Sequence, residues 1–150
     1  MSNTTKDYLF VGIQFALFAA YAIRPQILSI ELPKTVAYAG LVIAISGLCT
    51  GVLALIQIRS SFSPFPTPVA HGELVSNGLF RLSRHPIYSS ILLGAFGYAL
   101  YTGSGDRLLI GLGFLLLFYF KSSYEEQLLS EKYAGYTNYK RRVGRFTPWW

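Results

Sequence analysis

Long stretches without charged residues constrain this chain more than any other feature. The range 35–58 contains no Asp, Glu, Lys or Arg, and neither do the ranges 8–23, 86–105 and 108–120. A helix of about 20 apolar residues spans the hydrocarbon core of a bilayer. Only 13% of all residues are charged, whereas soluble domains carry about 25%. The sequence therefore predicts an all-α integral membrane protein with about four transmembrane helices.

The last two uncharged ranges predict a helical hairpin, because Gly103 and Gly105 lie in a short polar turn between them. The range 108–120 is short for a span, about 20 Å at 1.5 Å per residue. We expect its helix to continue into the polar sequence beyond, and Lys121 to extend its ammonium to the membrane interface. A helical tail should follow. The chain reads as one domain, 1–150, with a helix pair in 1–58 and a second part in 59–150.

Two features of the N-terminal half bear on processing and packing. Arg24-Pro25-Gln26 is not a small-residue cleavage site, so we expect the first apolar range to be retained as a helix. Gly47 and Gly51 have the GxxxG spacing that permits close helix approach, and packing within the chain is a simpler use for it than a dimer. The lone cysteine, Cys49, excludes an internal disulfide.

The distribution of basic residues predicts the orientation in the membrane. With four crossings, one side carries Lys6, Arg59, Arg81, Arg84, Lys121, Lys132, Lys140, Arg141, Arg142 and Arg145, and the other carries Arg24, Lys34 and Arg107. The positive-inside rule places the side with more basic residues in the cytoplasm. Both termini and the polar sequence around Arg84 are then cytoplasmic, and the net charge of +6 suits an anionic lipid surface.

Several common site types do not fit the sequence. His71 and His85 have no cysteine or carboxylate partners at metal-ligand spacing, so we expect no metal site. Gly111-Leu112-Gly113 lacks the third glycine of a dinucleotide-binding turn. There is no GxSxG element and no P-loop, and the membrane context argues against a nucleic-acid partner.

Four motifs remain, and they occur in order around the predicted hairpin. Charged residues directly beside a membrane segment usually mark a functional site. The motifs are Gly72-Glu73-Leu74-Val75-Ser76-Asn77-Gly78-Leu79-Phe80, then Arg84-His85-Pro86-Ile87-Tyr88, then Glu125-Glu126 with Leu129, and finally Tyr136, Tyr139, Val143, Arg145 and Pro148. Together they resemble the isoprenylcysteine carboxyl methyltransferase family, which is related to membrane phospholipid methyltransferases.

The resemblance implies S-adenosyl-L-methionine as cofactor and methylation of a lipophilic acceptor that arrives from the bilayer. By position it implies that the cofactor contacts Gly72, Glu73, Leu74, Val75, Phe80, His85, Pro86, Ile87, Tyr88 and Glu125. We take Arg84 and Glu126 as candidate catalytic residues, with Glu126 as the general base if the acceptor is an amine or a thiol. The candidate substrate-binding residues are Lys121, Tyr139 and Arg142. Lysine at position 121 departs from the arginine of the family and lacks its bidentate fork.

The chemistry of these side chains is compatible with that reading. Arg84 and His85 can donate hydrogen bonds to a carboxylate, and Glu125 can accept from an ammonium. Because His85 precedes Pro86, we expect it at the mouth of a helix that starts at the proline. Lys121 and Glu125 are four residues apart, which places them on one helix face.

The sequence leaves the acceptor open: a prenylcysteine, a phospholipid amine, a thiol and a quinone-like molecule all remain. We expect membrane lipids and a lipophilic or lipid-modified substrate as partners. A membrane oxidoreductase of the steroid-reductase type and a non-catalytic membrane protein are the alternative functions.

Overall fold

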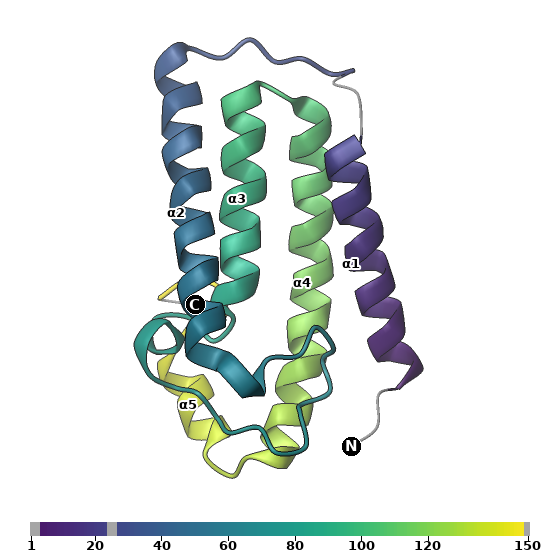
Figure 1. Cartoon of the computed structure of the whole chain (residues 1–150), viewed down its shortest axis with the longest axis vertical. Coiled ribbons are helices and arrows are strands. Elements are labelled where there is room, and N and C mark those ends of the chain that lie inside the picture. The colour runs from purple at the N-terminus through teal and green to yellow at the C-terminus, as the bar shows by residue number, and fades with distance from the viewer. Residues whose placement is uncertain (1–3, 24–26, 149–150) are drawn as a thin grey trace.

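Four long helices make up most of the protein and lie side by side in the order α2, α3, α4, α1 (Figure 1). The computed structural model describes residues 4–23 and 27–148; Arg24, Pro25 and Gln26 lie outside the described residues. Its α-helices are α1 (Thr5–Ile23), α2 (Lys34–Ile58), α3 (Pro86–Thr102), α4 (Gly105–Lys132) and the short α5 (Tyr136–Arg142). Two 3-10 turns are η1 (Arg59–Ser61) and η2 (Gly78–Arg81). The all-α prediction is confirmed.

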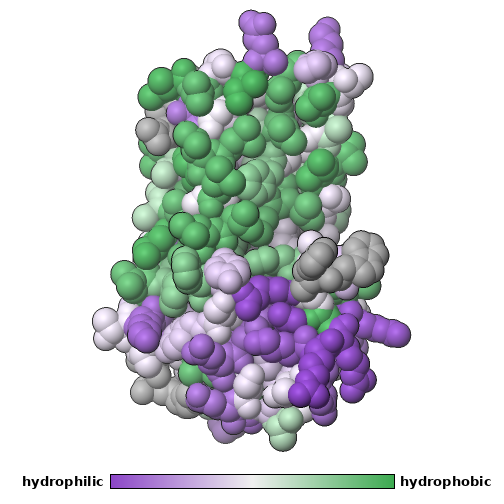
Figure 2. All heavy atoms as spheres, turned by 180° about the vertical axis from the view of Figure 1, so that it is seen from behind, coloured by the Kyte–Doolittle hydropathy of each residue, from purple (hydrophilic) through white to green (hydrophobic). Residues whose placement is uncertain are grey.

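The long helices carry an apolar band of membrane width. Three of them, α1, α2 and α4, are long and apolar enough to cross a membrane, judged within the described residues. The fourth, α3, has 17 residues, about 26 Å at 1.5 Å per residue, and runs beside α2 and α4 (Figure 1). Hydrophobic side chains cover the long helices, and hydrophilic ones gather at the end that carries α5 (Figure 2). As predicted, α4 continues past the apolar range, to Lys132.

Glycines let α2 and α3 approach until their backbones touch. A Cβ added at Gly97 would lie 2.5 Å from the backbone nitrogen of Ala44, and one at Gly40 would lie 2.7 Å from the carbonyl of Gly97. At Gly47 the nearest atoms belong to the backbone of α3, at 2.8 Å. Small residues at a membrane helix interface are what permits this contact. The Gly47–Gly51 pair therefore packs within the chain, as predicted.

The turn between α3 and α4 is tied to the link between α1 and α2. Gly103 ends α3 in the left-handed region, with φ 60°, where a glycine has no steric penalty. Its carbonyl accepts from the Ile30 nitrogen at 2.7 Å, and the Gly105 nitrogen donates to the Leu28 carbonyl at 2.7 Å. The predicted hairpin is present, and these bonds hold α1 and α2 to its closed end.

At the opposite end, the segment 62–77 is fastened to α1 and α4. The carboxylate of Asp7 is fully buried and accepts from the backbone nitrogen of Thr67 at 3.0 Å and from its hydroxyl at 2.7 Å. The ammonium of Lys132 donates to the carbonyls of Val69 and Ala70. This segment thereby forms one wall of the candidate active site.

Candidate active site

The start of α3 is held by the C-terminal segment of the chain. His85 is the N-cap residue of α3, with φ −126°, and Pro86 occupies the first helical turn, as predicted. The backbone nitrogen of Arg84 donates to the Gly144 carbonyl at 2.9 Å, and that of His85 donates to the Arg145 carbonyl at 3.1 Å. The fourth sequence motif therefore meets the second one in space.

Glu126 is the centre of a buried ionic cluster. Its side chain is fully buried and receives the Nε of Arg84 at 2.9 Å and the Nε2 of His85 at 3.2 Å. Its other oxygen, Oε2, lies 2.8 Å from the Nζ of Lys140 and 3.3 Å from the Nη2 of Arg145. A carboxylate with so many cationic partners is held ionised and in one position. This arrangement joins α3, α4 and α5.

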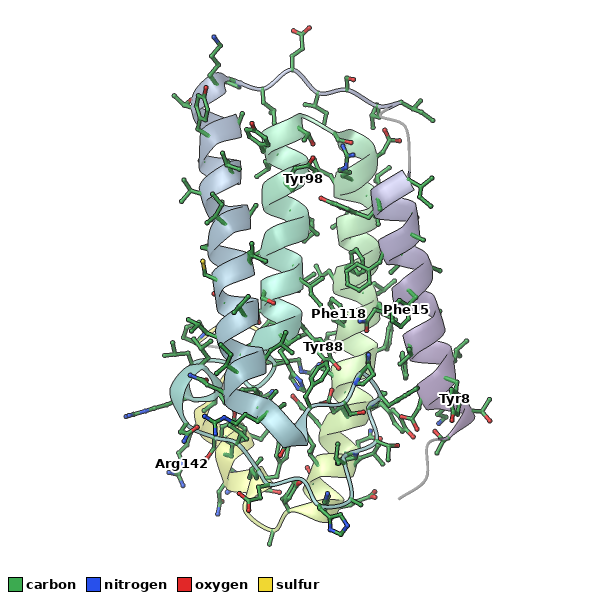
Figure 3. The ribbon with its side chains drawn as sticks, viewed as in Figure 1. Tyr8, Phe15, Tyr88, Tyr98, Phe118 and Arg142 are labelled. Carbon is green, nitrogen blue, oxygen red and sulfur yellow. The ribbon has the colours of Figure 1, made fainter. Side chains whose placement is uncertain are left out.

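Glu125, one residue earlier, faces a different set of groups. Its Oε2 accepts from the hydroxyl of Tyr88 at 2.7 Å and lies 3.8 Å from the Nδ1 of His85. The His85 and Tyr88 rings stack with centroids 5.3 Å apart, and Tyr88 stacks in turn on Phe118 at 4.6 Å. Tyr88 and Phe118 lie together inside the helix bundle (Figure 3). The stack fixes the aromatic wall beside Glu125.

Lys121 does not extend to the membrane interface. Its side chain is 1% exposed, and its Nζ donates to the Oε1 of Gln14 at 2.7 Å and to the Pro64 carbonyl at 2.7 Å. The ammonium also lies 5.5 Å from the centroid of the Tyr88 ring. The predicted outward orientation is wrong, because two neutral oxygen acceptors inside the bundle hold the ammonium there.

Two cavities adjoin at this site. The first, here called the polar cavity, lies under the segment 62–77 and is lined by Gly72, Glu73, Leu74, Val75, Leu129, Tyr133, Tyr136 and Tyr139 among others. The second, the lateral cavity, lies between the helices and is lined by Gln14, Gly51, Leu55, Pro86, Ile87, Tyr88, Ile91 and Lys121 among others. Both are lined by Ile58, Ser63, Phe80, Arg84 and Glu125. Arg84 and Glu125 therefore stand where the two cavities meet.

The predicted site residues fall into three groups. Most of them line one or both cavities. The residues that line the polar cavity alone are Gly72, Glu73, Leu74, Val75 and Tyr139, and those that line both are Phe80, Arg84 and Glu125. The lateral cavity alone is lined by His85, Pro86, Ile87, Tyr88 and Lys121, so four of the ten predicted cofactor contacts lie outside the polar cavity. Glu126 lines neither cavity, but it contacts Arg84 and His85, which do. Arg142 is exposed on α5 and borders neither cavity (Figure 3). Arg142 instead lines a third cavity with Leu74 and Tyr139, which also line the polar cavity, so it lies beside the site and not in it.

The comparisons with known proteins agree with this arrangement. The sequence model of the phospholipid methyltransferase family matches residues 35–135, which is more than half of the chain. The chain belongs to this family. Its members transfer methyl groups in membranes, and the apolar helices described above agree with a membrane methyltransferase.

The fold also resembles a solved structure. The eukaryotic intramembrane Ras methyltransferase, an isoprenylcysteine carboxyl methyltransferase, superposes with a TM-score of 0.65 at 20% identity. The match covers 99% of this chain and 55% of that one, so the chain spans about half the length of its structural relative. No curated protein sequence matches the chain. The family member described here thus has an isoprenylcysteine-methyltransferase-like membrane fold.

Some residues of the site were not predicted from the sequence of this methyltransferase-family chain. Gln14 lines the lateral cavity, and Lys140 and Arg145 contact Glu126. Gln14 had a usable signal, since it is the single carboxamide in the range 8–23 and polar side chains within membrane helices usually face the bundle interior. Tyr133 had no such signal, because it lies outside the four motifs.

Two tyrosines of the polar cavity, Tyr136 and Tyr139, carry neutral hydroxyl groups at physiological pH. Burial raises the pKa of Tyr139 to about 12, and the nearby Arg84 lowers it only in part. Burial, together with the charges of Glu126 and Glu125, raises the pKa of Tyr136. Both phenols therefore act as hydrogen-bonding groups there and not as acids.

Proposed function

We propose that this protein transfers a methyl group from S-adenosyl-L-methionine to a lipophilic, anionic acceptor at the point where the two cavities meet. The observation that supports it is the pairing of a cavity lined by polar groups with a cavity between apolar helices. Arg84, Phe80 and Glu125 line both. A water-soluble cofactor can then approach from the aqueous side, and a membrane-borne acceptor from the bilayer.

The polar cavity has the groups that the cofactor needs. Glu125 offers a carboxylate for the ammonium of the cofactor, Arg84 offers N–H donors for its carboxylate, and Phe80 offers an apolar ring. Tyr136 adds a buried hydroxyl without a hydrogen-bond partner among the described residues. The chemistry supplied by the bound cofactor is a methyl group on a positively charged sulfur, which is already activated. The task of the protein is therefore positioning.

The lateral cavity suits a lipid chain that ends in a polar head. Leu55, Ile58, Ile87 and Ile91 line it, and a methylene kept in this surrounding avoids about 0.8 kcal/mol of exposure to water. Its polar end has the buried ammonium of Lys121, whose two hydrogen-bond acceptors are neutral. Among the described residues this ammonium forms no salt bridge, although the charges of Glu125 and Asp7 act on it, and a buried cation without a salt bridge favours an anionic ligand. We therefore place the acceptor carboxylate beside Lys121.

The side chains around Arg84 support a carboxylate acceptor over an amine or thiol. A carboxylate is ionised at neutral pH and needs no base, whereas an amine or thiol acceptor must lose a proton. Glu126 contacts three cationic side chains, those of Arg84, Lys140 and Arg145, as well as the His85 ring, and a carboxylate held by cations is a poor base. We infer instead that Glu126 positions Arg84 and that Tyr139 positions Phe80, whose carbonyl accepts from the Tyr139 hydroxyl. Arg142 has no part in this proposal.

A phospholipid amine is the alternative acceptor, and the name of the family supports it. The two acceptors can be compared directly by incorporation of labelled methyl groups into a prenylcysteine and into phosphatidylethanolamine in the same vesicles. We expect the prenylcysteine to be methylated. Transfer to the amine alone would remove the anionic acceptor from the proposal.

The cofactor assignment is tested by calorimetry on detergent-purified protein with S-adenosylhomocysteine. We expect the wild type to bind, and Glu125→Gln to bind about ten- to a hundredfold more weakly, since a charge-assisted hydrogen bond contributes about 1.5–3 kcal/mol. Glu131→Gln is the matched control, because Glu131 is exposed on the same helix. Equal affinity of Glu125→Gln and wild type would remove Glu125 from the cofactor site.

A further inference from the structure

Three tyrosines follow one another at intervals of three residues where α4 passes into α5: Tyr133, Tyr136 and Tyr139. All three line the polar cavity. The rings of Tyr136 and Tyr139 meet edge to face, with centroids 5.8 Å apart. Their hydroxyl groups nevertheless have different surroundings.

The two outer hydroxyl groups are used within the protein. Tyr133 donates to the Gly72 carbonyl at 2.6 Å, and Tyr139 donates to the Phe80 carbonyl. Gly72 and Phe80 are the first and last residues of the first sequence motif, which forms a wall of the polar cavity. Tyr133 and Tyr139 thus hold that segment closed over the cavity at both of its ends.

The middle hydroxyl has no such partner. Tyr136 is 1% exposed, and its hydroxyl lacks a hydrogen-bond partner in the part of the chain that the structure describes. An unpaired buried hydroxyl destabilises a folded protein, which is why such groups are rare and usually have a reason. Tyr136 lines the polar cavity together with Glu125 and Arg84, and the charges of Glu126, Glu125 and Arg84 act on its phenol. The unpaired hydroxyl is therefore the polar group that Tyr136 can offer to a ligand in this cavity.

We propose that the hydroxyl of Tyr136 is a ligand-binding group that hydrogen-bonds a polar atom of the S-adenosyl cofactor in the polar cavity. This inference rests on the proposed function and adds a residue to its cofactor site. The unpaired hydroxyl of Tyr136 lowers the stability of the ligand-free protein and raises its affinity for the cofactor. Tyr133 and Tyr139, in contrast, stabilise the protein by holding the wall of the polar cavity closed.

The substitution Tyr136→Phe should weaken cofactor binding without lowering the stability of the ligand-free protein. Removing an unpaired buried hydroxyl should leave the melting temperature of the ligand-free protein unchanged or raise it by about 2–4 °C. The same change should weaken S-adenosylhomocysteine binding about three- to tenfold in calorimetry, the usual contribution of one neutral hydrogen bond. Tyr133→Phe is the matched control and should lower the melting temperature by about 2–4 °C, because its hydroxyl has a protein acceptor.

Each contrary result has its own meaning. If Tyr136→Phe binds S-adenosylhomocysteine as tightly as the wild type, the hydroxyl does not contact the cofactor and the inference is wrong. A fall in melting temperature as large as that of Tyr133→Phe would show that Tyr136 has a structural partner, and would overturn it too. If the wild type itself does not bind S-adenosylhomocysteine, the proposed function fails first.

Discussion

The Nε of Arg84 donates to Oε1 of Glu126 at 2.9 Å, and the two side chains are 8% and 0% exposed. The pair joins the residue before the α3 cap to the polar half of α4. The guanidinium also donates to the carbonyls of Lys140 and Val143, at the end of α5. One buried ion pair thus links the cavity junction to the C-terminal segment.

Glu126→Gln should therefore destabilise the protein and misplace Arg84. Breaking a buried ion pair from one side costs about 3–5 kcal/mol, because the remaining charges stay buried without compensation. Thermal unfolding in detergent measures the loss, and Glu131→Gln, exposed on the same helix, is the control. A Glu126→Gln protein as stable as the control would mean that the cluster contributes nothing to folding.

The contact between α2 and α3 predicts opposite effects for two glycines of one helix. Gly97→Ala should destabilise the fold, since the new Cβ would lie 2.5 Å from the Ala44 nitrogen. Gly94→Ala should be neutral or stabilising by about 0.5–1 kcal/mol, because nothing lies within 4 Å of its added Cβ and alanine favours a helix. Thermal unfolding of both variants in detergent checks whether Gly97→Ala is the less stable of the two. The opposite order of stability would mean that α3 presents a different face to α2.

The charge distribution predicts that α5 and the polar cavity lie in the cytoplasm. In a Cys49→Ser background, a cysteine at Asn138, exposed on α5, should react with a membrane-impermeant maleimide only after the membrane is opened. A cysteine at Glu31, exposed in the link between α1 and α2, should react in intact cells. The reverse labelling pattern would invert the proposed orientation.

Local rules were sufficient to predict the helices. Uncharged ranges located the long helices, Pro86 fixed the start of α3, and Gly103 fixed its end, because each of these signals acts within one helical turn. The packing of Gly47 within the chain followed from its spacing with Gly51, but that spacing did not identify α3 as the partner. These features depend on neighbours in sequence.

The site was predicted less completely because its contacts are distant in sequence. Lys121 points inward because Gln14, 107 residues away, and the Pro64 carbonyl, 57 residues away, accept its hydrogen bonds. Arg142 follows Tyr136 by six residues, a rotation of about 240° on a helix, so burial of Tyr136 turns Arg142 outward. The outward orientation of Arg142 could therefore have been derived from helical spacing. The inward orientation of Lys121 required knowing that α1 packs beside α4.

The contact of Lys121 with Gln14 gives the last prediction, which separates acceptor from cofactor. Lys121→Ala should lower kcat/KM for an anionic prenylcysteine about ten- to a hundredfold, as expected for a charge-assisted hydrogen bond. Gln14→Leu leaves the ammonium with only the Pro64 carbonyl and should lower kcat/KM about three- to tenfold, mainly through KM, because Gln14 positions Lys121 and does not react.

Binding of S-adenosylhomocysteine should change little in either variant, since Lys121 and Gln14 line the lateral cavity and not the polar one. Phe15→Leu is the control, because Phe15 is 62% exposed on the same helix as Gln14 (Figure 3). Weaker cofactor binding with an unchanged acceptor KM in Lys121→Ala would move Lys121 to the cofactor side. An unaltered Gln14→Leu enzyme would mean that α1 anchors the bundle without shaping the acceptor site.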